Sequence, residues 1–170
     1  IDICLPPHLH FSACKKAMEA GKHVICEKPM AMNLVEADLM IQTAESYNQH
    51  LFIHQNYRFQ SIFTHLQEVI NSGVLGDLYH IRNYNSNFAR RDDWQTLAKN
   101  GGGVLNNKCT HNLDMIMQLM GGKVETVMGD LQQIASGGDV EDHVKAFLKA
   151  DILFPKLPQP SFALKYCQYF

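Results

Sequence analysis

Between Ile1 and His54 the sequence alternates short apolar segments with longer segments of helical periodicity, and this order constrains the fold more than any other feature. The short segments are rich in β-branched and other apolar residues, which is typical of buried strands. The expected order is strand 1–5, helix 8–20, strand 23–26, helix 34–47 and strand 51–54. Strands that alternate with helices in this way predict an α/β fold with a parallel sheet and crossover helices.

Local signals mark the ends of these elements. Pro6 and Pro7 end the first strand, because proline has no backbone N–H to donate. Gly21 follows the first helix, where a helix C-cap is expected. Asn33 is a suitable N-cap for the second helix, and Glu36 stands three residues later, in the capping-box position.

After residue 57 the pattern changes, and we expect a domain boundary near residues 57–60. The expected elements are helices 62–70 and 104–119 and strands 78–88, 124–134 and 140–150. This order predicts an α+β domain with an antiparallel sheet. Residues 151–170 contain Pro155, Pro158 and Pro160 and have no clear period, so we interpret them as an atypical tail, either a linker or a sequence foreign to the domain.

Charge and cysteine content narrow the functional classes. The formal net charge is -2, so there is no basic field that would hold nucleic acid. No apolar run approaches the ~20 residues that a membrane-spanning helix needs. The 5 cysteines are widely spaced and never form a CxxC pair, which argues against a disulfide framework or a zinc ribbon. We therefore expect a cytoplasmic protein that binds neither nucleic acid nor membranes.

Lys28 follows the second expected strand, in the tripeptide Glu27-Lys28-Pro29. In open α/β sheets ligands bind at the carboxyl edge of the strands, which is where this lysine would lie. A lysine there can donate to a substrate hydroxyl or carbonyl, and burial can lower its pKa far enough for proton transfer. The alternative is a solvated turn with no function.

Asn107, His111 and Asp114 are spaced by four and three residues, so on a helix they share one face. Histidine is the side chain best suited to proton transfer near neutral pH. The alternative is a buried, hydrogen-bonded histidine beside a solvated carboxylate. The preceding glycines at 101–103 would allow the backbone to approach a ligand closely. His8 and His10 are better interpreted as a helix cap and a site wall than as metal ligands, so no metal site is expected.

These segments occur in a specific order. They are DICLPPHLH at 2–10, AGKHVICEKP at 20–29, NYRF at 56–59, GVLG at 73–76, Trp94, GGGVL at 101–105, His111 and Asp114. In this order they strongly resemble the Gfo/Idh/MocA family of glucose–fructose oxidoreductase, inositol dehydrogenase and their relatives. The resemblance extends over residues 1–150.

The resemblance implies a Rossmann domain followed by an α+β domain with a large, mainly antiparallel open sheet, which commonly forms an oligomer interface. Residues 1–57 would be the C-terminal part of the Rossmann domain, 58–150 the substrate and oligomerisation domain, and 151–170 the atypical tail. The glycine-rich phosphate turn GxGxxG occurs nowhere in the chain. We therefore expect an N-terminally truncated fragment, with the first Rossmann half preceding Ile1.

The resemblance also implies a site for NAD or NADP. Its expected cofactor-binding residues are Pro6, His10, Glu27, Lys28 and Arg58, with Arg58 near the domain junction. Lys28 would contact substrate and nicotinamide, and His111 would be the catalytic histidine. Asn107 stands where the family usually has aspartate. An amide can hydrogen-bond a hydroxyl but cannot accept its proton, so proton transfer would fall to His111 or Lys28.

Two functions follow as hypotheses. The first is an NAD(P)-dependent dehydrogenase that transfers a hydride to or from a secondary alcohol of a sugar, cyclitol or related polyol, and that assembles as a homo-oligomer through the second sheet. The second is a truncated chain without catalysis that acts only as a scaffold or oligomerisation module. The absent phosphate turn favours the second for the isolated chain, and the presence of Lys28 and His111 favours the first.

Overall fold

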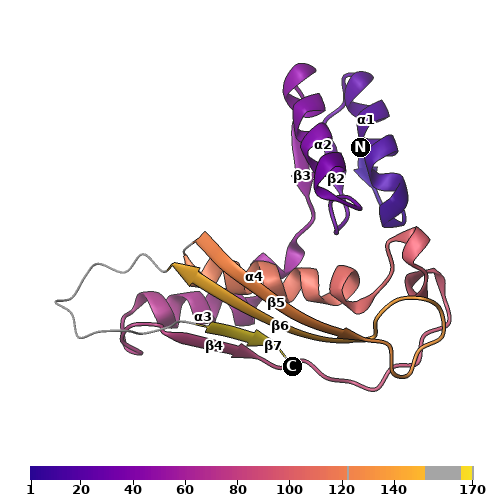
Figure 1. Ribbon diagram of the computed structural model, residues 1–170. Coiled ribbons are helices and arrows are strands. Elements are labelled where there is room, and N and C mark those ends of the chain that lie inside the picture. The colour runs from indigo at the N-terminus through magenta and orange to yellow at the C-terminus, as the bar shows by residue number, and fades with distance from the viewer. Residues whose placement is uncertain (122, 152–165, 170) are drawn as a thin grey trace.

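The computed structural model describes residues 1–121, 123–151 and 166–169. The chain forms two units of helices and strands, one around a three-stranded sheet and one around a four-stranded sheet (Figure 1). No helix in these ranges is long and apolar enough to cross a membrane.

The first unit is the parallel sheet that the alternating pattern predicts. Its elements are β1 (Asp2–Ile3), η1 (Pro7–Leu9), α1 (His10–Glu19), β2 (Val24–Cys26), α2 (Leu34–Ser46) and β3 (Leu51–Ile53). The strand order is β1-β2-β3, and both pairs are parallel. The core between sheet and helices includes Cys14, Met18, Val24 and Met40, each with an exposed fraction of 0%.

The expected cap of α2 is confirmed. The Asn33 side chain accepts a hydrogen bond from the Glu36 backbone N–H at 3.0 Å. The Glu36 carboxylate reaches back to the backbone N–H of Met32 at 3.1 Å, one residue earlier than in a standard capping box. These two hydrogen bonds fix the backbone between the Glu27-Lys28-Pro29 segment and α2.

The second unit is α+β, but its sheet is smaller than expected. Its elements are η2 (Asn56–Phe59), α3 (Ser61–Asn71), β4 (His80–Asn83), η3 (Trp94–Thr96), η4 (Ala98–Asn100), a π-helical turn (Leu105–Cys109), α4 (Thr110–Met120), β5 (Lys123–Gln132), β6 (His143–Asp151) and β7 (Tyr166–Tyr169). The order among the described strands is β4-β7-β6-β5. Two pairs are antiparallel, whereas β4 and β7 are parallel.

Two expectations for this unit need correction. The strand expected at 78–88 is only four residues long, because β7 offers partners to His80–Asn83 alone. The segment expected to be an atypical tail contributes β7, which lies between β4 and β6. Residues 152–165, with all three prolines of that segment, lie outside the described residues.

The core of the second unit lies between α4 and β6. Ile116 and Met120 of α4 pack against Ala146, Leu148 and Ala150, which alternate along β6 and share one face. This packing fixes α4 along the sheet (Figure 1). The π-helical turn before α4 is therefore held at a defined position relative to the second sheet.

The first of the glycines at 101–103 lies at a contact between the two units. Gly101 has a φ of 77°, and a Cβ there would lie 2.6 Å from the Met32 sulfur and 2.7 Å from the Pro7 side chain. The absence of a side chain thus lets this loop of the second unit contact the first unit. An approach of these glycines to a ligand stays a prediction.

Candidate active site

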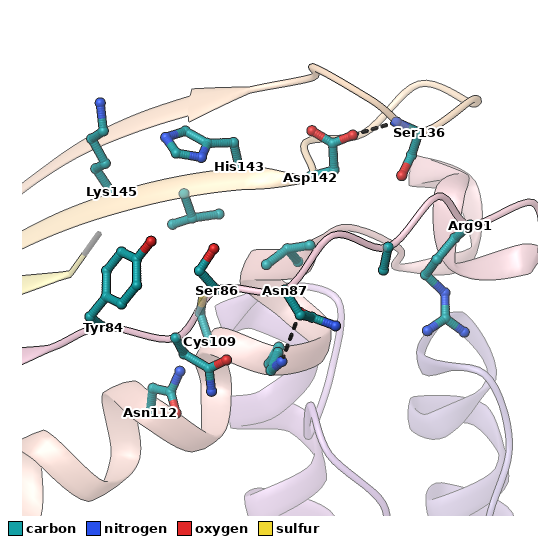
Figure 2. Close-up of a pocket in the computed structure, with 15 residues that line it drawn as sticks. Tyr84, Ser86, Asn87, Arg91, Cys109, Asn112, Ser136, Asp142, His143 and Lys145 are labelled. Atoms are coloured by element: carbon teal, nitrogen blue, oxygen red, sulfur yellow. Dashed lines mark hydrogen bonds between the residues drawn. The ribbon is translucent and has the colours of Figure 1, made fainter.

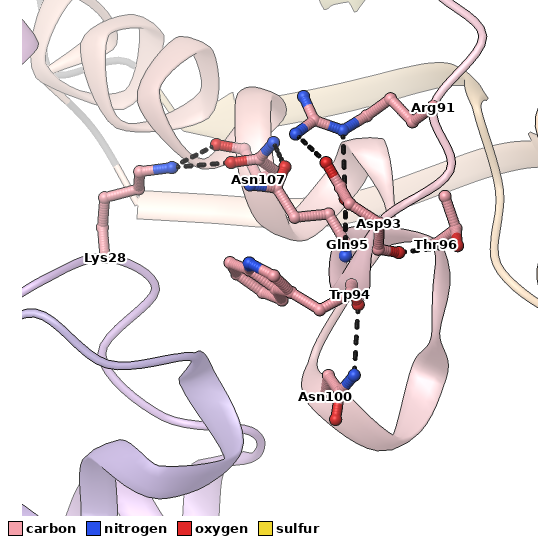
Figure 3. A network of polar contacts seen from close by, with 8 residues as sticks. All are labelled: Lys28, Arg91, Asp93, Trp94, Gln95, Thr96, Asn100 and Asn107. Carbon is pink, nitrogen blue, oxygen red and sulfur yellow. Dashed lines mark hydrogen bonds and ion pairs between the residues drawn. The ribbon is translucent and has the colours of Figure 1, made fainter.

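Lys28 connects the two units. It follows β2 and is half-buried, and its Nζ donates to the backbone oxygen of Asn107 at 2.6 Å and to Oδ1 of Asn107 at 3.0 Å (Figure 3). The two residues are 79 positions apart in the sequence. Residues that the sequence analysis selected separately therefore meet at the carboxyl edge of the parallel sheet.

Asn107 also contacts Gln95, a residue of η3. Its Nδ2 donates to the Oε1 of Gln95. The chain of contacts thus runs from Lys28 through Asn107 to Gln95, and Trp94 lies beside it with 40% of its surface exposed (Figure 3).

His111 lies in α4 with an exposed fraction of 7%. Its ring stacks on Tyr57 with a centroid distance of 3.9 Å and an interplanar angle of 10°. Its Nδ1 lies 3.2 Å from Oε1 of Gln55. With the Gln55 oxygen facing Nδ1, the ring would donate from Nδ1 and keep the lone pair of a base on Nε2.

Burial and nearby charges shift the pKa values of both groups. Burial lowers the pKa of the Lys28 ammonium, and the Glu27 carboxylate partly opposes this shift. Burial also lowers the pKa of His111, and the positive charge of Lys28 lowers it further. Both shifts favour the neutral forms, which are the forms that accept a proton.

Glu27 is held by the neighbouring strand. Its Oε1 pairs with Nδ1 of His54, just after β3, at 2.7 Å, and its Oε2 accepts from the backbone N–H of Lys28 at 3.3 Å. Burial would raise the pKa of the Glu27 carboxyl, but these hydrogen bonds outweigh it and the pKa is lowered. The carboxylate therefore stays charged beside Lys28.

The remaining expected site residues lie in different surroundings. His10 is fully buried, with its ring nitrogens 2.7 Å from the Leu5 oxygen and 2.8 Å from the Pro29 oxygen, so it supports the Lys28 loop from behind. Arg58 forms a two-point ion pair with Asp114, with Nε 2.7 Å from Oδ2, which joins η2 to α4. A cofactor role for either residue stays a prediction.

A cleft of about 390 Å³ lies at this edge of the first sheet. It is lined by Cys4, Leu5, Pro6, Pro7, Glu27, Lys28, Trp94, Gln95 and Asn107. An apolar wall with a few converging polar groups is typical of a small-molecule site, and this wall fits the nicotinamide end of a dinucleotide. The sequence has no GxGxxG turn, the motif that would hold the diphosphate. The chain's residues thus fit one end of the cofactor.

A second cavity, also of about 390 Å³, lies beneath β6 (Figure 2). Its walls include Tyr84, His143 and Lys145. Inside it the Nζ of Lys108 donates to Oδ1 of Asn87 at 3.3 Å. No residue that the sequence analysis assigned to the site lines this cavity. The π-helical turn separates the two spaces, because Asn107 lines the cleft and Lys108 lines the cavity.

Sequence reasoning missed Gln55, Tyr57 and Gln95 as site residues. Gln55 follows β3 closely, so its place at the carboxyl edge of the sheet was a usable signal. Tyr57 lies in the NYRF motif, but nothing in the sequence indicates that its ring stacks on His111. No feature of the sequence indicates Gln95 as a site residue, because its contact with Asn107 depends on how the loops fold.

A parallel α/β sheet with a lysine at its ligand edge, opposed by an asparagine and a histidine from an α+β domain, indicates a two-domain dinucleotide-dependent oxidoreductase. Residues 1–55 match the model described as "Oxidoreductase family, NAD-binding Rossmann fold". Residues 63–151 match the model described as "GFO/IDH/MocA C-terminal domain". The chain belongs to the GFO/IDH/MocA family of NAD-binding oxidoreductases.

Individual relatives agree with this assignment. An uncharacterized oxidoreductase of Schizosaccharomyces pombe is 33% identical over 71% of this chain and 33% of its own length. The myo-inositol 2-dehydrogenase of Thermotoga maritima is 29% identical over 84% of this chain and 43% of its own length. A crystal structure of an NAD-binding protein from Listeria innocua superimposes with a TM-score of 0.85 and 27% identity, over 99% of this chain and 45% of that one. The chain therefore spans less than half the length of each.

Proposed function

We propose that these residues serve an NAD- or NADP-dependent dehydrogenase that acts on a secondary alcohol of a sugar, cyclitol or related polyol. The observation that carries the proposal is the contact of Lys28 with Asn107, which joins a lysine at the ligand edge of a Rossmann-type sheet to the other domain. Membership of the family and the similarity to a myo-inositol 2-dehydrogenase support this substrate class.

The side chains have separate roles in this proposal. Lys28 binds the substrate oxygen and stabilises the negative charge that develops on it. Asn107 orients Lys28 and cannot itself take a proton. His111 accepts the alcohol proton at Nε2, whose lone pair is free when Nδ1 donates to Gln55. Leu5, Pro6 and Glu27 would line the nicotinamide end of the cofactor. A bound nicotinamide supplies the hydride acceptor or donor.

The activity is tested by measuring NAD(P)H formation in a longer oxidoreductase that contains these residues and a GxGxxG turn. Oxidation of myo-inositol or of other cyclic polyols is the expected result. Simple primary alcohols should react far more slowly. The proposal would be contradicted if no sugar, cyclitol or polyol served this enzyme as a substrate for the reduction of NAD or NADP.

The 170-residue chain itself should bind NAD(H) and NADP(H) only weakly. The reason is that a glycine-rich turn at a helix N-terminus normally holds the diphosphate, and this sequence contains none. Isothermal titration calorimetry measures the affinity, with a longer protein that contains the turn as the positive control. A dissociation constant in the micromolar range for the 170-residue chain would contradict this expectation.

A second function, oligomerisation, rests on a different observation. The edge strand β5 and the loop after it expose Val127, Met128, Leu131 and Ile134, with exposed fractions of 65%, 65%, 52% and 66%. Val127 and Leu131 lie on one face of the strand and Met128 lies on the other, because successive side chains of a strand alternate between its faces. Exposed apolar residues of this kind often mark a protein interface. We therefore propose that the chain self-associates through the sheet that contains β5 and β6.

A single charge on β5 should disrupt this association. Met128→Glu is expected to lower the mass measured by light scattering, because burying a carboxylate in an apolar interface is costly. Leu34→Glu is the matched control, since Leu34 is 75% exposed on α2, in the other unit. Finding only monomer for the unmodified chain at high concentration would rule out the interface.

A further inference from the structure

We propose that Gln95 is both a positioning residue and a substrate-binding residue: its Oε1 orients the Asn107 amide toward Lys28, and its Nε2 binds a second oxygen of the substrate, next to the reacting carbon. The inference rests on the dehydrogenase function proposed above and extends it to a residue that no sequence motif indicates.

The orientation of both amides follows from the lysine. An ammonium group has only donors, so the Asn107 side-chain atom that faces Lys28 must be the oxygen, Oδ1. The nitrogen of that amide, Nδ2, then faces Gln95, and only an acceptor can face it. Gln95 therefore presents Oε1 to Asn107. Each step allows only one arrangement, so the donor-to-acceptor direction of the hydrogen bonds from Lys28 through Asn107 to Gln95 is fixed. We call this direction the polarity of the three side chains.

This polarity leaves the Nε2 amide of Gln95 without an acceptor among the described residues, although Gln95 lines the same cleft as Lys28. Lys28 has three N–H bonds and donates two of them to Asn107. The cleft thus holds unused donors on two neighbouring side chains, beside the exposed ring of Trp94. A matching ligand has two adjacent acceptor oxygens, as in a vicinal diol, an α-hydroxy ketone or an α-hydroxy acid.

The backbone of Gln95 is held in place from both sides. Its N–H donates to Oδ1 of Asp93 at 2.9 Å, and its carbonyl accepts from the Gly103 N–H at 2.9 Å. Arg91 in turn pairs with Asp93 (Figure 3). A Cβ at position 102 would lie 2.7 Å from the Gln95 carbonyl carbon, so Gly102 is required for this approach. A side chain on such a fixed backbone is suited to positioning.

The same polarity explains why asparagine suits position 107. An aspartate there would present only acceptors. Gln95 would then have to turn its Nε2 toward position 107, and its Oε1 would face the cleft. The substrate would meet an acceptor where it now meets a donor.

The positioning role is tested by the titration of Lys28 in the 170-residue chain, observed by NMR with ε-¹³C-labelled lysine. Gln95→Glu should raise the pKa of Lys28, because it adds a negative charge nearby. Gln95→Met should lower this pKa, because the Asn107 amide can turn its oxygen away from the ammonium. Asn107→Ala should lower it as well, and Gln42→Met, an exposed site on α2, should leave it unchanged.

A Lys28 titration that is the same in Gln95→Met as in the unmodified chain would overturn the positioning role. Gln95→Glu serves as a second variant: it retains an acceptor for Asn107 and adds a negative charge, so a Lys28 pKa that does not rise in this variant would also count against the positioning role. Thermal unfolding of each variant establishes that the fold is retained. None of these measurements depends on catalysis.

The substrate-binding role is tested by kinetics in a longer, cofactor-binding protein. Gln95→Met should raise KM for a vicinal diol by roughly tenfold, the effect of one lost hydrogen bond, and should change kcat less. For an alcohol without the second oxygen, the Gln95→Met variant and the unmodified protein should have the same KM. Equal KM values for the diol would overturn this role. If the unmodified protein oxidises no polyol, the dehydrogenase proposal fails, whereas the Lys28 titration still decides the positioning role.

Discussion

Lys28→Ala is expected to lower kcat/KM for polyol oxidation by about 10²–10⁴-fold in a longer oxidoreductase that contains these residues. The ammonium bridges the loop after β2 and the π-helical turn, and its pKa is lowered by burial. Its loss removes the group that binds the substrate oxygen and stabilises the charge on it. Steady-state NAD(P)H formation at saturating cofactor measures the effect.

Lys22→Ala is the matched control, because Lys22 is an exposed lysine in the turn after α1. It should leave kcat/KM unchanged. Lys28→Ala also removes two hydrogen bonds between the units, so its thermal unfolding must be compared with that of the unmodified protein. A folded Lys28→Ala variant with near-normal kcat/KM would exclude the lysine from the mechanism.

His111→Asn should abolish the acidic limb of the pH–rate profile for alcohol oxidation. The base form is the neutral imidazole, so the rate should rise with pH through the pKa of His111. Burial and the Lys28 charge lower that pKa, so the limb should lie below the ordinary imidazole value of about 6.5. The measurement is kcat/KM as a function of pH for both proteins.

The coupling to Lys28 gives an internal control. Any residual activity of Lys28→Ala should show its acidic limb at higher pH, because the positive charge that lowers the pKa of His111 is gone. His65→Asn is the matched control, since His65 is an exposed histidine on α3. An acidic limb that persists unchanged in His111→Asn would assign proton transfer to another group, with Lys28 as the first candidate.

The first unit was predictable because its signals are local. Apolar periodicity defined its strands and helices, and Asn33 caps α2 as its side-chain chemistry requires. Lys28 could be assigned to the ligand edge because a residue directly after a parallel strand must lie there. Its meeting with Asn107 followed from a family pattern and not from spacing.

The second unit was less predictable because its structure depends on distant partners. The alternating pattern of residues 78–88 indicates an extended chain, but strand length depends on the neighbour, and β7 pairs with four residues only. Likewise, Asp114 shares a helical face with His111 by spacing, yet its carboxylate is bound by Arg58. A sequence pattern gives the direction of a side chain and leaves its partner undefined.

The π-helical turn Leu105–Cys109 sets the position of the acceptor for Lys28. Such a turn closes hydrogen bonds from residue i to i+5, so it contains one residue more than an α-helical turn. The carbonyl of Asn107, which lies within this turn, accepts a hydrogen bond from Lys28. Deleting one codon would rotate the preceding residues by about 100° around the helix axis. The acceptor for Lys28 is thus encoded partly by the length of one turn.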